Sequence, residues 1–304
     1  MKRNSQASSD RRTGRRDFLL QTGCLLAGAG IGCLTRESAA ADSEDPAVPL
    51  LRIGLLTDLH YADKPAAGSR HYRDSRAKLA AAGKRFAEAK TDLVIQLGDS
   101  VDTATSLEAE KEALRNIHAE FAAIPAPRHY VLGNHCVSAL TKADFLEIVG
   151  QPKSFYSFDL NQHHIVILDA CFRSDGVAYG GVKFDWGDAN VPPEEIEWLR
   201  NDLQQTSLAT IVFVHQRLDV APPYGVKNAP ELRRILEESK RVLAVFQGHD
   251  HRGDVRVING IHYCTLRAMV EGAGLDNNAF AILDVLPGGE LRLTGFGKQP
   301  SYRW

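Results

Sequence analysis

Hydrophobic positions along the chain fall into two alternating patterns. Near-continuous apolar runs such as LLRIGLLTD (50–58), DLVIQLGD (92–99) and RHYVLGN (128–134) are typical of strands buried on both faces. Between them, apolar residues recur at helical spacing over 73–90 and 107–124. This β-α-β-α-β order predicts a parallel sheet with right-handed crossovers.

The second half of the chain predicts a second sheet. SFYSFDL and HHIVILDA flank an Asn-Gln turn and predict an antiparallel hairpin, and ATIVFVH and VLAVFQGHD predict two more buried strands. Helices are expected over 192–204 and 229–239, and several short strands between 254 and 296. Residues 173–192 read as a loop long enough to form a lid or rim over a site. We expect one α/β domain over 51–298, a four-layer αββα sandwich of two mixed sheets flanked by helices.

The first 41 residues differ in kind from the rest. They are basic, continue through RRDFLL into a glycine-containing apolar stretch at 18–34, and end on three alanines. That order predicts a twin-arginine signal peptide over 1–41 rather than a stable membrane span, followed by a linker over 42–50. We therefore expect export by the twin-arginine machinery to the periplasm or the cell exterior.

Charge and cysteine content narrow the function. From residue 42 onward the chain has 29 Lys and Arg against 35 Asp and Glu. This acidic balance argues against a nucleic-acid partner, including a nuclease substrate, because such proteins need a basic face. Beyond the predicted signal the cysteines are Cys136, Cys171 and Cys264, an odd number without CxxC spacing, so no disulfide framework is expected.

Potential metal ligands follow five of the apolar runs. They are Asp58, His60, Asp99, Asn134, His215, His249 and His251. Because sites in α/β proteins form at the carboxyl ends of strands, these side chains are expected to meet. Glycines at 98, 133 and 248 precede ligands and permit close backbone approach.

These donors predict a dinuclear centre. One cation would be held by Asp58, His60, Asp99 and His251, and the other by Asp99, Asn134, His215 and His249, with Asp99 bridging. A hydroxide between the cations would attack phosphorus, and His135 would protonate the leaving oxygen or stabilise the transition state. The imidazole and carboxylate donors suit Mn, Fe, Zn or Co, and the residues alone do not choose among them.

The motifs also resemble a known family. LLTDLHYAD, RHYRDSRAKL, QLGDSVD, LGNH, PEEIEWL, GHDHRGD and VEGAGLDNNAFAILDV are similar to calcineurin-like metallophosphoesterases, and in particular to the manganese-dependent ADP-ribose/CDP-alcohol diphosphatases, over about 53–298. The resemblance implies two divalent cations, with manganese favoured, and hydrolysis of phosphodiester or pyrophosphate bonds in small nucleoside-diphosphate-linked molecules. It also implies substrate contacts from Arg70, Tyr72 and Arg73, where an arginine can pair with phosphate.

Three positions depart from related patterns. His60 stands where that family usually has Gln, and Cys136 stands where GNH is normally followed by an acidic residue that supports the histidine. Asp102 replaces the ligating tyrosine of purple acid phosphatases, which argues against a tyrosinate–iron site. Two alternatives remain: a phosphomonoesterase that scavenges phosphate, and a metal-binding scaffold that has lost catalysis, for which Cys136 is the only support.

Overall fold

The computed structural model describes residues 48–181 and 184–304. The predicted signal peptide (1–41) and most of the predicted linker (42–50) lie outside the described residues. Within the described part, no helix has the length and apolar character needed to cross a membrane.

Two mixed sheets of six strands each form the centre of the fold. The first has the order β12-β11-β10-β1-β2-β3, with bounds Leu51–Leu56 (β1), Leu93–Gln96 (β2), Arg128–Tyr130 (β3), Ala279–Val285 (β10), Leu291–Gly297 (β11) and Tyr302–Arg303 (β12). The second has the order β4-β5-β6-β7-β9-β8, with bounds Tyr156–Leu160 (β4), His163–Ile167 (β5), Ala209–Phe213 (β6), Val242–Gln247 (β7), Asp254–Ile258 (β8) and Ile261–Thr265 (β9). The predicted parallel pairing of β1, β2 and β3 is confirmed.

Side chains point to alternate faces along each strand, so one strand contributes to two apolar clusters, one between the sheets and one under the helices. In β1, Ile53 and Leu55 enter the apolar cluster between the two sheets, whereas Leu56 enters the cluster under the helices. In β6, Ile211 packs between the sheets while Val212 faces the opposite side. Since both faces of these strands are buried, their sequences are continuously apolar rather than alternating.

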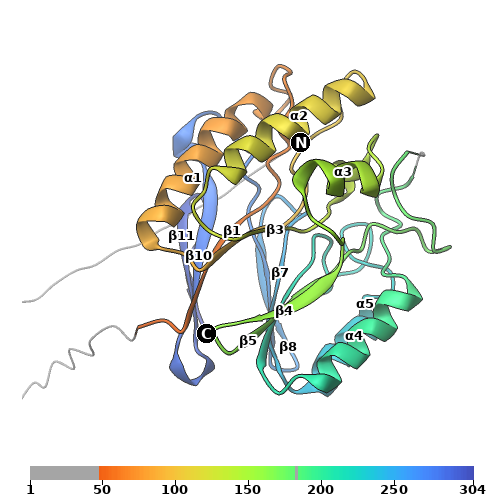
Figure 1. Ribbon diagram of the computed structural model, residues 1–304, viewed down its shortest axis with the longest axis vertical. Coiled ribbons are helices and arrows are strands. Elements are labelled where there is room, and N and C mark those ends of the chain that lie inside the picture. The colour runs from red at the N-terminus through yellow and green to blue at the C-terminus, as the bar shows by residue number, and fades with distance from the viewer. Residues whose placement is uncertain (1–47, 182–183) are drawn as a thin grey trace, which may run out of the picture. The chain divides into compact units, whose positions relative to one another are not determined.

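Helices cover the outer face of each sheet (Figure 1). On the first sheet these are α1 (Ser75–Ala89), α2 (Leu107–Ala122) and α3 (Lys142–Val149), and on the second α4 (Pro193–Gln205) and α5 (Ala229–Ser239). Side-chain caps fix several ends: the Ser106 side chain accepts from the Ala109 amide at the start of α2. The predicted α/β class, with two mixed sheets flanked by helices, is confirmed.

Several details go beyond the prediction. The sequence analysis did not include α3, whose eight residues are held by a capping box between Thr141 and Asp144 and end at Gly150 in the left-handed conformation. The short strand β12 pairs with β11 beyond residue 298. Among the described residues of 173–192 there is neither helix nor strand, as expected for a loop.

Candidate metal centre

Loops that leave the carboxyl ends of β1, β2, β3, β6 and β7 carry the predicted ligands. The β1 and β2 loops are joined by backbone hydrogen bonds, from the Asp58 amide to the Gly98 carbonyl at 3.0 Å and from the His60 amide to the Asp99 carbonyl at 2.8 Å. The Gly248 amide donates to the His215 carbonyl at 3.0 Å, which joins the β6 and β7 loops in the same way. Ligands from distant parts of the chain are therefore held by paired backbones.

Four predicted ligands lie in the left-handed backbone region, which non-glycine residues rarely adopt. Their φ values are 49° for Asp58, 44° for His60, 55° for Asp99 and 69° for His249. Such residues cost of order 1–3 kcal/mol each and persist where the surrounding structure holds them. Their concentration in the loops after β1, β2 and β7 marks the carboxyl ends of these strands as a candidate functional site.

Two glycines are required by close approach. A Cβ at Gly133 would lie 2.2 Å from the Asp99 Oδ1 atom, and one at Gly248 would lie 2.1 Å from the Thr57 Oγ1 atom. A side chain at either position would displace a ligand loop. The sequence prediction of close approach at these glycines agrees with the structure.

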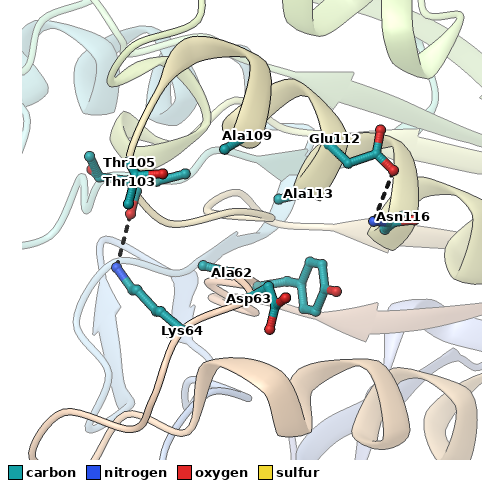
Figure 2. A pocket seen from close by; sticks show the side chains of 11 residues that line it. Ala62, Asp63, Lys64, Thr103, Thr105, Ala109, Glu112, Ala113 and Asn116 are labelled. Carbon is teal, nitrogen blue, oxygen red and sulfur yellow. Dashed lines mark hydrogen bonds between the residues drawn. The ribbon is translucent and has the colours of Figure 1, made fainter.

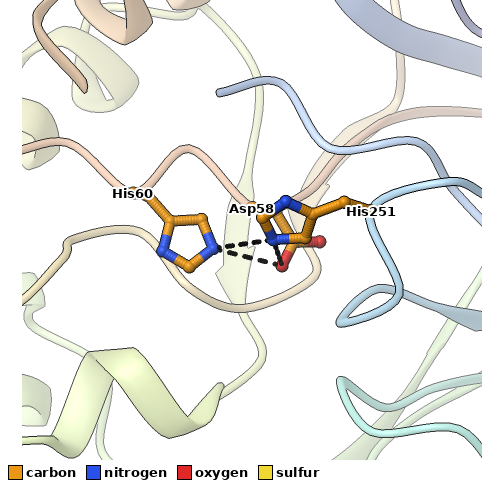
Figure 3. A group of neighbouring side chains, drawn as sticks. All are labelled: Asp58, His60 and His251. Carbon is orange, nitrogen blue, oxygen red and sulfur yellow. Dashed lines mark hydrogen bonds and ion pairs between the residues drawn. The ribbon is translucent and has the colours of Figure 1, made fainter. Parts of the chain in front are cut away.

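One group of ligand atoms comes from Asp58, His60 and His251 (Figure 3). The Nε2 atoms of the two histidines lie 3.1 Å apart, and each is 3.6 Å from Asp58 Oδ1. Their other nitrogens face carboxylates: His251 Nδ1 is 2.5 Å from Glu271 Oε1, and His60 Nδ1 is 3.3 Å from Asp102 Oδ2. Such partners orient a histidine ligand and raise its basicity.

A second group comes from Asp99, His215 and His249. His215 Nδ1 lies 2.7 Å from the Leu97 carbonyl oxygen and so carries the proton that it donates there. That leaves Nε2, 3.2 Å from Asp99 Oδ2, as the free nitrogen. Asp99 Oδ2 also lies 3.6 Å from His60 Nε2, so Asp99 stands between the two groups.

The residues fit a pair of divalent cations. Several buried donor atoms have no hydrogen-bond partner in the described structure, namely Asp58 Oδ1, Asn134 Oδ1, His215 Nε2 and His249 Nε2. Buried polar atoms are nearly always paired, so a cluster of unpaired acceptors requires a ligand. Carboxylate, amide oxygen and imidazole nitrogen are the donors that first-row divalent metals take.

Electrostatics at the centre follow from burial and close carboxylates. Burial opposes the charged form of His60, but hydrogen bonds to Asp102 and Asp58 raise its pKa to about 9. Burial likewise opposes protonation of His215, yet the charge of Asp99 raises its pKa. For His249, burial and the neighbouring charge of His215 lower the pKa to about 3, so this imidazole is neutral.

His135 lies beside the centre with a carboxylate behind it. Its backbone amide donates to Asp99 Oδ1 at 2.8 Å, and its Nδ1 atom lies 3.4 Å from Asp102 Oδ1. Cys136 is fully buried, its sulfur accepts from the Ser100 amide at 3.4 Å, and burial raises the thiol pKa to about 12. The carboxylate facing His135 therefore comes from the β2 loop, three residues after Asp99, and not from position 136.

The centre opens into a pocket of about 230 Å³. Its lining includes five predicted ligands, His135, Arg70 and two aromatic residues, Trp186 and Tyr224. The ring centroids of Trp186 and Tyr224 lie 5.4 and 5.7 Å from that of His249, and their side chains are 42% and 38% exposed. Sequence analysis did not identify either residue, because both lie in irregular segments without periodicity.

The three predicted substrate residues separate in the structure. Arg70 lines the metal pocket, and its guanidinium lies 3.3 Å from Asp102 Oδ2. Tyr72 is buried in a small apolar cluster, and Arg73 pairs with the exposed Asp63 at 2.6 Å. Only Arg70 of the three is among the residues that line the pocket.

Comparisons with known proteins agree with this geometry. The chain matches the calcineurin-like phosphoesterase family over residues 51–253. It is 26% identical over 298 residues to a manganese-dependent ADP-ribose/CDP-alcohol diphosphatase of Oryza sativa subsp. japonica, covering 82% of this chain and 92% of that protein. A protein of the same name from Arabidopsis thaliana is 24% identical over 274 residues, covering 73% and 87%.

A solved structure shows the same fold. The crystal structure of a dimetal phosphatase from Danio rerio superposes with a TM-score of 0.74 at 21% identity, covering 84% of this chain and 99% of that one. The family match spans most of the chain and includes all five loops that carry the predicted ligands. The chain therefore belongs to the calcineurin-like phosphoesterase family, and it is a hydrolase acting on phosphoester or phosphoanhydride bonds.

Proposed function

We propose that this chain hydrolyses the diphosphate linkage of small nucleoside-diphosphate-linked molecules at a dinuclear metal centre. The observation that carries the proposal is a cluster of buried oxygen and nitrogen donors without hydrogen-bond partners, from Asp58, Asn134, His215 and His249. Asn134 and His249 line the metal pocket, and Asp58 and His215 belong to the ligand groups beside it. The names of the two plant relatives, both ADP-ribose/CDP-alcohol diphosphatases, favour this substrate class.

The chain's own residues supply the other parts of the reaction. When bound, two divalent cations would supply Lewis-acid activation of water and neutralise charge on the phosphoryl group. His135 stands at the pocket with Asp102 behind it, in position to hold a proton for the leaving oxygen. Arg70 is the lining arginine that would pair with a phosphate oxygen of the substrate.

The aromatic wall favours a nucleotide over a simple phosphoester. Trp186 and Tyr224 lie 5.6 Å apart, tilted by 56°, and both are partly exposed beside His249. Exposed aromatic rings at the mouth of a pocket offer a stacking surface to a planar base, worth about 1–3 kcal/mol per base in other proteins. A phosphomonoester without a base would make no use of this wall.

Manganese is the proposed metal. The donors are carboxylate, amide and imidazole groups without a thiolate, which suits Mn, Fe, Zn and Co alike. Both plant relatives carry manganese dependence in their names, and this favours Mn among the four.

Export is part of the same proposal. Arg15 and Arg16 precede an apolar stretch and small residues, the order of a twin-arginine signal, and we propose that the enzyme acts in the periplasm or outside the cell. The test fuses residues 1–41 to a reporter that is active only after folded export. Paired Arg15→Lys and Arg16→Lys changes should abolish export, and a reporter exported equally well without the arginines would contradict it.

The substrate test uses the protein from Asp42, stripped of metal and reloaded with Mn. We expect hydrolysis of ADP-ribose and CDP-choline with a higher kcat/KM than that of p-nitrophenyl phosphate. Bis-p-nitrophenyl phosphate reports on diester cleavage without a base. A preference for p-nitrophenyl phosphate would replace the proposal with phosphomonoester scavenging. Metal binding without turnover of any of the four compounds would identify a scaffold.

A further inference from the structure

Lys78, on helix α1, is a completely buried lysine that hydrogen-bonds only to the main chain in the described structure. Its Nζ atom lies 2.8 Å from the Met269 carbonyl oxygen, 2.9 Å from that of Glu271 and 2.7 Å from that of Gly272. Carbonyl oxygens can only accept, so these three bonds need three N–H groups. The site therefore binds the charged ammonium, because the neutral amine has only two.

A second lysine near the metal centre shows how unusual this environment is. Lys64 lines a pocket between helix α2 and the segment after His60 (Figure 2), its side chain is 34% exposed, and it pairs with Asp102 at 3.2 Å. Lys78 has neither solvent nor a carboxylate in contact within the described part of the chain, and burial lowers its pKa. A buried ammonium of this kind opposes folding unless its hydrogen bonds compensate.

The three carbonyls belong to the segment 269–272, which lies between two loops of the metal centre. On one edge of the segment, the Val270 amide donates to the Asp58 carbonyl at 3.0 Å. On the other edge, the Gly272 amide donates to the Ser69 carbonyl at 2.7 Å. The segment that Lys78 holds therefore joins the loop of a candidate metal ligand to the loop that carries the arginine of the metal pocket.

Glu271, inside this segment, connects Lys78 to a candidate ligand. The Glu271 carbonyl accepts from Lys78, while its side-chain Oε1 lies 2.5 Å from His251 Nδ1. Lys78 thus fixes the main chain of the residue whose carboxylate faces His251. Carboxylates in this position orient a histidine ligand, and their loss weakens metal binding.

Helix α1 has further contacts with the chain beyond this segment. The Asn278 side-chain amide donates to the Lys78 carbonyl at 2.8 Å, and the Gly274 amide donates to Asp74 Oδ2 at 2.8 Å. Removal of the ammonium group leaves these contacts in place. The change therefore acts mainly on residues 269–272 and not on the docking of the helix.

We propose that Lys78 is a positioning residue for the metal centre, whose buried ammonium holds the segment 269–272 and thereby keeps the Glu271 carboxylate against His251. The inference rests on the metal centre of the proposed function and not on its substrate. Hydrogen bonds from a charged donor are stronger than those from a neutral one, so one side chain can hold three carbonyls of an irregular segment.

The test is a double-mutant cycle read by Mn affinity in equilibrium dialysis, with Lys78→Met and Glu271→Gln made singly and together. If Lys78 acts through Glu271, Lys78→Met should lower Mn affinity about tenfold in the unaltered protein and less than about twofold in Glu271→Gln. A lysine that only stabilises the fold would not show this coupling. Equal fold-losses in both backgrounds, or no loss in the unaltered protein, would overturn the positioning role.

Hydrogen exchange of the metal-free protein tests the contact itself. Lys78→Met should speed exchange of the 269–272 amides about tenfold, because the segment loses three hydrogen bonds. Arg128→Met is the matched control: Arg128 also donates to main-chain carbonyls, those of Ile124 and Ala126 at 2.7 Å, but it begins β3, at the opposite end of the strand from the ligand loop. The control should change neither this exchange nor Mn affinity.

The two readouts separate this inference from the proposed function. Mn affinity and hydrogen exchange need no substrate, so a protein that binds Mn but hydrolyses nothing still tests Lys78. If the unaltered protein binds no Mn, the proposed function fails. Exchange at 269–272 that is no faster in Lys78→Met than in Arg128→Met would overturn the positioning role whatever the activity.

A second variant covers a failure to fold, which thermal melts in chelator would reveal. Lys78→Gln keeps two N–H donors without the charge, so we expect it to lose less Mn affinity than Lys78→Met, about threefold in the unaltered protein. In Glu271→Gln the same change should have no effect. If Lys78→Met does not fold, the cycle is made with Lys78→Gln, and equal losses in both backgrounds would again overturn the role.

Discussion

Two clusters of carboxylates lie at the carboxyl ends of the strands, one in the loops after β6 and β7 and one in the loops after β1 and β2, and they differ in the source of their positive charge. In one, Arg217 is only 3% exposed and pairs with Asp219 at 2.6 Å, Asp250 at 3.1 Å and Asp254 at 2.6 Å. In the other, the candidate metal centre, Asp58 and Asp99 pair within the described structure with imidazoles, backbone amides and the Thr57 hydroxyl, and with no lysine or arginine.

The difference separates a structural cluster from a functional one. Arg217 carries a permanent charge, so its cluster is complete within the chain and fixes Asp250 between the two ligand histidines of the β7 loop. In the metal centre the positive charge is exchangeable, because a proton and a metal cation compete for the same nitrogens of His60 and His215. Buried carboxylates by themselves do not mark a site, whereas unpaired donors that converge do.

Removing a carboxylate from the candidate metal centre should have the largest effect on activity. Asp99→Asn removes the carboxylate that stands between both ligand groups, and we expect kcat/KM with Mn to fall by at least about a thousandfold. In the unaltered protein, Mn should raise the melting temperature by mass action, and this increase should disappear in the variant. Parallel thermal melts with Mn and with chelator provide the measurement.

Removing Arg217 from the other carboxylate cluster should mainly affect stability. Arg217→Met removes the buried partner of three carboxylates, Asp219, Asp250 and Asp254. Because the exposed Arg252 and Arg256 still pair with them, we expect the free energy of unfolding to fall by about 3 kcal/mol, the lower end for a broken buried ion pair. The exposed Arg234 on α5 gives a matched control, Arg234→Met. Urea unfolding measures both variants, and a loss at Arg217 no larger than that at Arg234 would refute the distinction between the clusters.

The carboxylates that face the outer nitrogens of the ligand histidines can be neutralised one at a time by substitution. Glu271→Gln keeps the size of the side chain but removes the charge that faces His251 Nδ1, so we expect Mn affinity to fall about 10–100-fold. Glu88→Gln, on the exposed surface of α1, should leave the affinity unchanged. Equilibrium dialysis against Mn, with metal content read by mass spectrometry, would show whether the two variants differ.

The smallest expected effect is the dependence of Mn affinity on pH. A metal must displace the proton from His60, whose pKa is raised to about 9 by Asp102 and Asp58 against the opposing effect of burial. Mn affinity should therefore rise with pH below 9, by up to about tenfold per unit where one proton is displaced. Calorimetry in buffers of different ionisation enthalpy measures the protons released when Mn binds. A Mn affinity that does not change between pH 6 and 8 would contradict competition between Mn and protons for His60.

The sequence predicted which candidate ligands lie together better than it predicted the groups that support them. The candidate ligands follow apolar strands, and parallel pairing brings those strand ends together, so the proximity of Asp58 and Asp99 could be expected without a structure. Glu271 lies twenty positions after His251, and its contact depends on the parallel pairing of β7 with β9. No local pattern encodes that contact.

The irregular segments hid the remaining features. Trp186 reaches the metal pocket from a segment without helix or strand, where neither periodicity nor a motif indicates direction. At position 136 the resemblance implied that an acidic support for His135 is missing, because this chain has Cys136 there, and the structure places the Asp102 carboxylate next to His135 instead. Helix α3 was missed because eight residues give little periodic signal.

Metal stoichiometry tests the dinuclear centre most directly. The protein from Asp42 is stripped, dialysed against Mn and analysed for metal bound per chain, beside Asp99→Asn treated in the same way. The unaltered protein should bind two Mn per chain and hydrolyse ADP-ribose, and the variant should lose at least one Mn together with activity. Two Mn and undiminished hydrolysis in Asp99→Asn would contradict a centre bridged by Asp99.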